Sequence, residues 1–155
     1  PGFIRVEADE VTYPAHIILR FEIERELIEG EIEAEDIPAL WAEKMQSLLG
    51  IDTFGNYTNG CLQDVHWTDG SFGYFPSYTL GAMYAAQWFA TIRRAVPDLD
   101  THIANGDFSP VFRWLRDNIW LQASRWETAE LAIRASGEPL NPIHLRRHLE
   151  QRYLS

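Results

Sequence analysis

The sequence predicts a single all-α domain, and three observations favour this class. Apolar residues recur at the three- and four-residue spacing of amphipathic helices in seven segments. Each segment also begins with a residue type that favours a helix start. The 155 residues are 46% hydrophobic, with six Trp, six Tyr and eight Phe, which is enough for one sizeable core. Since no linker, internal repeat or low-complexity tract divides the chain, we expect one domain over residues 1–155.

The first predicted helix runs from about Asp9 to Gly30, with Pro14 in its first turn, where proline is tolerated. We expect five residues on or near its apolar face: His16, Ile17, Phe21, Leu27 and Ile28. Eight carboxylates lie between Glu22 and Asp36. Because they are dispersed rather than converging, they predict a solvated surface and a turn instead of a cation site.

Six further helices follow, each introduced by a side chain that can cap a helix. Gly50 ends the second of the seven along the chain, Pro97 stops the long third and Gly137 closes the sixth. The six capping positions are Asp36, Ser77, Asp98, Ser109, Thr128 and Asn141.

Residues 51–77 have no helical period and form a long loop that is rich in glycine and aromatic residues. A loop of 27 residues in a small helical domain is usually functional or disordered. Its six aromatic residues argue against disorder. We therefore expect an ordered loop that builds a site, with room for a short strand or hairpin.

Polar side chains that could carry chemistry gather in this loop. Gln63, Asp64 and His66 lie within four residues, and Tyr78 follows at the start of the next helix. A rigidly presented site is one interpretation. The alternative is that His66 and Tyr78 are both structural. A buried imidazole is often held by a carboxylate such as Asp64 or by a backbone carbonyl, and a tyrosine is often part of the core.

Two segments resemble motifs of a known family. Gly60-x-x-Gln63-Asp64-x-His66-Trp67 is similar to the GxxQDxHW signature of the carboxypeptidase Taq family of HExxH metallocarboxypeptidases. Ile4-Arg5-Val6-Glu7-Ala8-Asp9 resembles the I(R)TEAD motif of the same family, with Val6 in place of Thr. The resemblance covers essentially the whole chain but only about the last third of a family member. It implies the C-terminal helical part of a catalytic domain.

The same resemblance implies zinc, or another divalent metal, in the full-length protein. The sequence has no His-Glu-x-x-His. His144 and His148 have its spacing, but Leu145 stands where the glutamate is required and two arginines follow. A catalytic zinc site needs three converging protein ligands and a base that activates water. We therefore assign no metal ligand and no bound metal to this chain, and expect it to be inactive alone.

The family places its carboxylate-binding arginine at the position of Arg5. A guanidinium suits that task because it can bind a carboxylate through two parallel hydrogen bonds. The alternative is a structural ion pair with Glu7 or Asp9. Under the first interpretation these two acids only order the motif.

By resemblance, His66 and Tyr78 together stabilise the negative oxygen that develops during peptide hydrolysis. Asp64 would orient the imidazole from behind, and Gln63 would line the substrate cleft. Cys61 occupies a variable position of its motif, and a Cys–His pair of unknown geometry is a poor basis for a thiol mechanism. We do not expect it to be a nucleophile.

Charge and hydropathy exclude several classes of partner. A formal net charge of -10 argues against nucleic acid, and no apolar run is long enough to cross a membrane. A single cysteine fits a reducing compartment, so we expect a cytoplasmic protein. The expected partner is a peptide with a free C-terminus. We also expect a homodimeric full-length protein and self-association of this chain, and a non-catalytic helical interaction domain is the alternative function.

Overall fold

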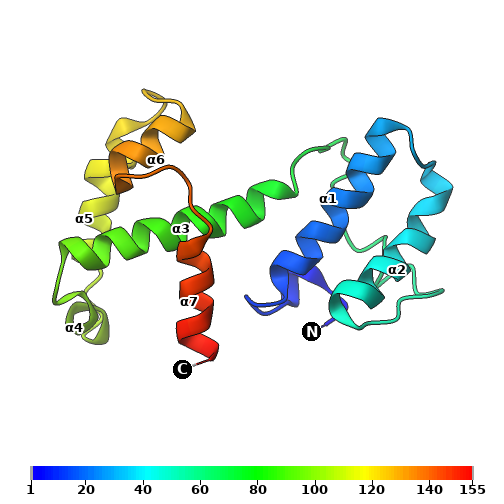
Figure 1. The fold of residues 1–155 in the computed structure, drawn as a ribbon, viewed down its shortest axis with the longest axis horizontal. Coiled ribbons are helices and arrows are strands. Elements are labelled where there is room, and N and C mark those ends of the chain that lie inside the picture. The colour runs from blue at the N-terminus through cyan, green and yellow to red at the C-terminus, as the bar shows by residue number, and fades with distance from the viewer. Residues whose placement is uncertain (1, 155) are drawn as a thin grey trace. The chain divides into compact units, whose positions relative to one another are not determined.

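The computed structural model describes residues 2–154, and all regular structure within that range is helical, which confirms the predicted class. The helices are α1 (Tyr13–Glu29), α2 (Ile37–Leu49), α3 (Pro76–Ala95), α4 (Leu99–Ala104), α5 (Ser109–Asn118), α6 (Thr128–Ser136) and α7 (Ile143–Tyr153) (Figure 1). Three short 3-10 turns accompany them: η1 (Arg5–Glu7), η2 (Ala34–Asp36) and η3 (Trp120–Gln122). Residues 51–75 contain turns and bends and no strand, so the suggested strand or hairpin does not form there.

Helix α1 begins four residues later than the sequence predicts. Asp9 Oδ1 accepts hydrogen bonds of 2.9 Å from the backbone N–H groups of Val11 and Thr12. This local turn takes residues 9–12 out of the helix, and Pro14 then lies in the first turn of α1. At the other end Gly30 adopts a left-handed conformation with φ of 72°.

The predicted inward face of α1 is partly wrong. Phe21 and Ile28 are exposed, whereas Arg20 and Glu24 are buried. The buried positions are His16, Ile17, Leu19, Arg20, Ile23 and Glu24. Their three- and four-residue spacing is helical, but half of them are polar, so apolar spacing alone misassigned this face.

Most of the predicted caps differ in detail. The Asp36 side chain accepts from the backbone N–H of Glu33 and so belongs to a capping box around η2, not to α2. Asp98 precedes α4 but makes no capping hydrogen bond with its side chain, which lies 3.3 Å from His102 Nε2 instead. Helix α3 begins at Pro76, one residue before Ser77. Helices α5 and α6 begin at Ser109 and Thr128 themselves, so the residues at the cap positions are Phe108 and Glu127, and neither predicted side chain caps its helix.

The chain forms two compact units, of which one ends at Leu80 and the other begins at Gly81. Both positions lie inside α3, so the boundary falls within a continuous helix and not in a linker. The assignment of residues 1–155 to one domain stays a prediction. No helix in residues 2–154 has the length and apolar character needed to span a membrane.

In the first unit, α1 and α2 pack side by side (Figure 1). Five buried side chains form the core between them: Leu19, Ile23, Trp41, Met45 and Leu49. Trp67 from the long loop packs against this core and meets the Trp41 ring edge to face, with centroids 6.4 Å apart. The loop is thereby attached to the two helices.

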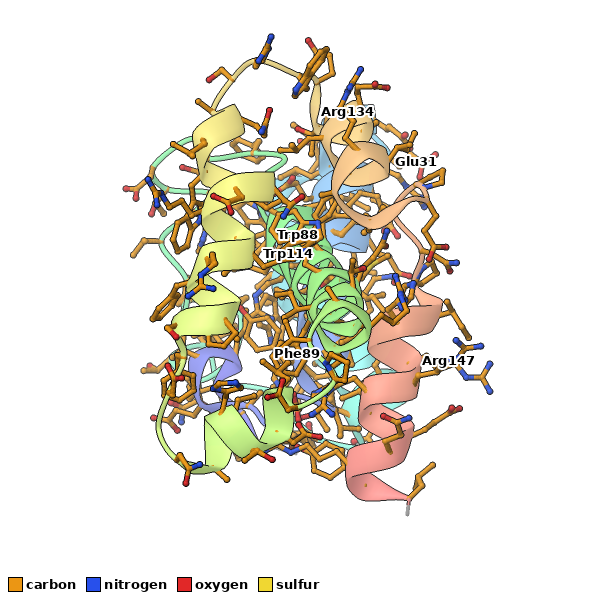
Figure 2. The ribbon with its side chains drawn as sticks, turned by 90° about the vertical axis from the view of Figure 1, so that its left-hand side faces the viewer. Glu31, Trp88, Phe89, Trp114, Arg134 and Arg147 are labelled. Atoms are coloured by element: carbon orange, nitrogen blue, oxygen red, sulfur yellow. The ribbon has the colours of Figure 1, made fainter. Side chains whose placement is uncertain are left out.

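In the second unit, Gln87 of α3 organises a buried polar network. Its Nε2 donates to Ser136 Oγ at 2.7 Å and its Oε1 accepts from the backbone N–H of Asn141 at 2.8 Å. These bonds attach the turn between α6 and α7 to α3. Figure 2 looks along α3, with Trp88 and Phe89 labelled, and places α5 on one side of it and α7 on the other.

Candidate functional site

The two motif segments meet through the side chain of Gln63. Its Oε1 accepts a 2.8 Å hydrogen bond from the backbone N–H of Arg5, and its Nε2 donates to the Phe3 carbonyl at 3.0 Å. The same Nε2 also donates to two carbonyls of its own turn, those of Asn59 and Gly60. Gln63 thus joins segments that are 58 to 60 residues apart. Its structural task is to hold η1 against the loop.

Gly60 is required by the close approach of the backbone. A Cβ at this position would lie 2.5 Å from the Asn56 carbonyl oxygen, a distance that real Cβ atoms do not show. It would also lie 3.6 Å from Trp41 Nε1. The glycine that begins the GxxQDxHW pattern therefore permits the turn that delivers Gln63.

Asp64 lies between two arginines and gives one carboxylate oxygen to each. Arg5 Nε and Nη2 donate to Oδ1 at 3.0 and 2.8 Å. Arg20 Nε donates to Oδ2 at 2.6 Å, and Arg20 Nη2 lies 2.6 Å from the same oxygen. Arg20 also donates to the His16 carbonyl at 2.7 Å and lies over the Trp41 ring. The predicted pairing of Arg5 with Glu7 or Asp9 does not occur, and both acids are exposed.

Burial and charge act in opposite directions on this cluster. Burial raises the pKa of Asp64, but the charge of Arg20 and the hydrogen bonds of both arginines outweigh it and lower that pKa below its ordinary value. Burial lowers the pKa of Arg20 to about 10. For Arg5 burial is again opposed by Asp64, and the net pKa is raised. All three groups are therefore charged at neutral pH.

His66 and Tyr78 form a hydrogen-bonded pair. His66 Nε2 and Tyr78 Oη are 3.0 Å apart. The other ring nitrogen, Nδ1, is buried and lies 3.8 Å from Asp64 Oδ1, beyond hydrogen-bond distance. Tyr74 and Phe75 pack on the imidazole with ring centroids 5.7 and 4.4 Å away. The imidazole is thus held by aromatic packing and by the phenol.

Arg5 connects the cluster around Asp64 to this pair. Its guanidinium carbon lies 4.8 Å from the centre of the Tyr78 ring, and its Nη1 donates to Tyr13 Oη at 2.8 Å. The Tyr78 ring therefore lies under the permanent cation of Arg5, while the hydroxyl of the same residue bonds to His66. An anion bound at Arg5 would lie beside groups that can donate hydrogen bonds to a second oxygen.

Sequence reasoning missed a charged stripe on α1. Arg20 binds the first half of the loop at Asp64, and Glu24, one turn further along, binds its second half. Glu24 Oε2 accepts from the Trp67 indole at 2.7 Å, and Oε1 accepts from the backbone N–H of Gly73. Their four-residue spacing with His16, in register with the buried apolar positions, was the available signal.

The structure brings together Arg5, Gln63, Asp64, His66 and Tyr78, five of the seven residues that the sequence nominates. Glu7 and Asp9 lie outside this cluster, and Asp9 caps the turn before α1. Burial raises the pKa of the Cys61 thiol, which does not favour a thiolate at neutral pH.

The residues present do not fit a catalytic metal ion. Among residues 2–154 no group of three or more His, Cys, Asp or Glu side chains could hold one. His144 Nε2 pairs with Glu138 Oε1 at 2.8 Å, which gives this histidine a structural partner. The side chains of this range therefore support no reaction step through a metal ion of their own.

Comparison with known proteins gives consistent matches over nearly the whole chain. Residues 1–153 match the carboxypeptidase Taq (M32) metallopeptidase family. Carboxypeptidase 1 of Bacillus subtilis is 45% identical over 153 residues, and thermostable carboxypeptidase 1 of Thermus thermophilus is 44% identical over 153 residues. Each alignment covers 99% of this chain and 30% of the relative.

Solved structures agree with this result. Metallocarboxypeptidase 1 of Trypanosoma cruzi superposes with a TM-score of 0.97 at 52% identity, over 100% of this chain and 32% of that one. A carboxypeptidase structure from Pyrococcus furiosus superposes with a TM-score of 0.95 at 42% identity, over 99% of this chain and 31% of that one. The chain thus spans about a third of the length of the relatives that it matches.

Proposed function

Because this chain belongs to the carboxypeptidase Taq (M32) family of metallopeptidases, we propose that the protein containing it is a metal-dependent carboxypeptidase that hydrolyses single amino acids from the C-terminus of peptides. In this proposal zinc or another divalent metal is bound by residues outside this chain. The chain supplies contacts to the substrate and is inactive alone.

One observation carries the proposal within the structure: Arg5 lies against the ring of Tyr78 while the hydroxyl of Tyr78 meets His66. An exopeptidase must recognise a free carboxylate at a fixed distance from the bond that it cleaves. A guanidinium fixed beside a hydrogen-bonding pair offers that relationship.

Each residue then has a definite task. Arg5 binds the substrate carboxylate, and Gln63 keeps the backbone of Arg5 in place. When substrate binds, His66 Nε2–H and the Tyr78 hydroxyl exchange their mutual hydrogen bond for hydrogen bonds donated to the carbonyl oxygen as negative charge develops on it. These bonds stabilise the transition state more than the ground state. Asp64 orients Arg5 through two hydrogen bonds and lies near the buried nitrogen of His66.

The alternative function, a non-catalytic helical interaction domain, is disfavoured by relatives that are named carboxypeptidases. A reading frame that encodes His-Glu-x-x-His upstream of these residues would support the catalytic proposal, and its absence would favour the alternative. The cytoplasmic location, the homodimer and the self-association of this chain stay predictions, and light scattering tests the last of these.

The direct test uses two N-blocked peptides that differ only at the C-terminus, one with a free carboxylate and one with a carboxamide. We expect the full-length protein to release the terminal residue from the first and not from the second. Chelation of divalent metal should abolish the release and added zinc should restore it. Hydrolysis of both peptides at equal rates, or activity that survives chelation, would contradict the proposal.

A further inference from the structure

The cluster around Asp64 carries one more positive charge than negative. Arg5 and Arg20 are two cations, and Asp64 is the single carboxylate bonded to both. His16, which lies one turn before Arg20, has its pKa lowered to about 4, first by burial and then by the charge of Arg20, and so is neutral at pH 7. The other buried carboxylate of α1, Glu24, accepts from Trp67 and Gly73 instead. One positive charge therefore remains without a bonded counterion among the described residues.

Arg20 is the arginine committed to neutralising Asp64. It has no solvent-exposed surface, and its head group is enclosed by Asp64, the His16 carbonyl and the rings of Trp41 and Phe75. A fully buried cation is stable only with a bonded counterion, and Asp64 supplies it. This leaves no route by which an external anion could reach Arg20.

Arg5 is the arginine left with unused capacity. Three of its five N–H bonds are occupied, two by Asp64 and one by Tyr13. One hydrogen on each of Nη1 and Nη2 has no partner among residues 2–154. Its guanidinium also lies at the aromatic surface of Tyr78, the ring that belongs to the proposed site.

We propose that Arg20 is a positioning residue that neutralises Asp64 and thereby leaves the charge of Arg5 available to the terminal carboxylate of a peptide. This inference rests on the proposed function and extends it to a residue of α1 that touches no substrate. Without Arg20, Asp64 would take Arg5 as its sole counterion. The Arg5 guanidinium would still be in place, but its charge would already be compensated.

Three variants distinguish the charge that Arg20 supplies from the structural support that its side chain gives. Arg20→Met removes the cation and keeps a long apolar side chain. Arg20→Lys keeps the cation but loses the planar fork. The double variant Arg20→Met with Asp64→Asn removes both the cation and the carboxylate, so that Arg5 is again uncompensated while the Asn carbonyl can still accept its hydrogen bonds.

The readout is the ability of the full-length protein to distinguish a carboxylate from its neutral counterpart. N-acetyl-phenylalanine and its carboxamide serve as competitive inhibitors of peptide hydrolysis, and the ratio of their inhibition constants is measured for each variant. We expect Arg20→Met to reduce this ratio by about tenfold or more, which corresponds to the loss of a charge-assisted contact. Arg20→Lys should keep most of the ratio, and the double variant should restore it.

A purely structural role for Arg20 predicts a different pattern. It would weaken both inhibitors equally or lower kcat alone, with the ratio unchanged, and that outcome overturns the inference. If Arg20→Met does not fold, the double variant decides the matter, because the buried Arg5 guanidinium keeps its hydrogen bonds to Tyr13 and to the amide oxygen at position 64: a ratio as low as that of an Arg5→Ala control contradicts the inference. A wild-type protein that does not prefer the carboxylate would instead refute the proposed function itself.

Discussion

Trp67 Nε1 donates a 2.7 Å hydrogen bond to Glu24 Oε2, across a sequence separation of 43 residues. The second oxygen of the same carboxylate accepts from the backbone N–H of Gly73. One buried side chain of α1 therefore holds both ends of the turn that follows His66. The position of the imidazole depends on a helix residue that does not contact it.

Glu24→Ala should destabilise the chain by about 2–4 kcal/mol, because a buried indole N–H and a backbone N–H both lose their acceptor. Urea unfolding of the 155-residue chain measures this difference. Glu29→Ala on the same helix is the matched control, since Glu29 is exposed and lies 3.9 Å from Arg25 in a surface pair. Equal effects of the two substitutions would show that Glu24 does not anchor the loop.

Two glycine substitutions should act in opposite directions. Gly60→Ala forces a Cβ to within 2.5 Å of the Asn56 carbonyl oxygen and should cost about 1–3 kcal/mol. Gly81→Ala, in the interior of α3 with no atom within 4 Å of the new Cβ, should stabilise by about 0.5–1 kcal/mol. Thermal unfolding should therefore show a lower Tm for the first and a higher Tm for the second. A stable Gly60→Ala variant would contradict the tight turn.

Tyr78→Phe should lower kcat of the full-length protein by about 10²-fold while KM changes little, because it removes the hydroxyl that donates to the transition state, together with its hydrogen bond to His66. The ring that contacts Arg5 remains in this variant. His66→Ala should have the same character. Tyr57→Phe, in an exposed part of the same loop, is the control and should leave kcat unchanged. A loss confined to KM would contradict the assigned roles of His66 and Tyr78.

Arg5→Ala should reduce kcat/KM for substrates with a free C-terminus by about 10- to 100-fold, the value of a charge-assisted contact. The chain should remain folded because Asp64 keeps Arg20 as its partner. Circular dichroism checks the fold, and initial rates give kcat/KM. An unchanged kcat/KM in a folded variant would remove Arg5 from the proposed site.

The all-α class and most helix ends could be predicted from the sequence because they depend on local signals. Ser109, Thr128 and Gly137 mark ends that the structure reproduces. Asp9 and Asp36 were misassigned since a carboxylate that can cap one turn can also cap its neighbour, and only the folded chain selects between them.

Gln63, Asp64 and His66 were nominated by motif and Tyr78 by the family resemblance, and all four are brought together in the structure. Arg20 and Glu24 were not, because their partners are far away in sequence and charged residues on a helix are usually solvated. Because α1 contains many charged residues, the sequence did not distinguish the two that fix the loop from those that face solvent. A single sequence shows the helical spacing of such residues, but it does not show which distant residues they bind.

His16 should make the stability of the chain depend on pH between about 6.5 and 4. Burial, then the charge of Arg20, lowers its pKa from 6.5 to about 4, so in this window the unfolded chain binds a proton that the folded chain does not. The contribution of His16 to the free energy of unfolding is therefore fully present above pH 6.5. It decreases as the pH falls toward 4, by up to about 3 kcal/mol. Arg5 and Asp64 also face the imidazole, with opposite signs.

His16→Leu should remove this contribution, because leucine cannot take up the proton. Urea unfolding at several pH values gives the slope for both chains, and the difference between the slopes isolates His16 from the carboxylates that titrate in the same range. NMR titration of the His16 ring in the wild-type chain should give a pKa of about 4. Identical slopes, or a titration midpoint near 6.5, would mean that the pKa of His16 is not lowered by folding. Below pH 6.5 a third cation would then lie beside Arg5 and Arg20.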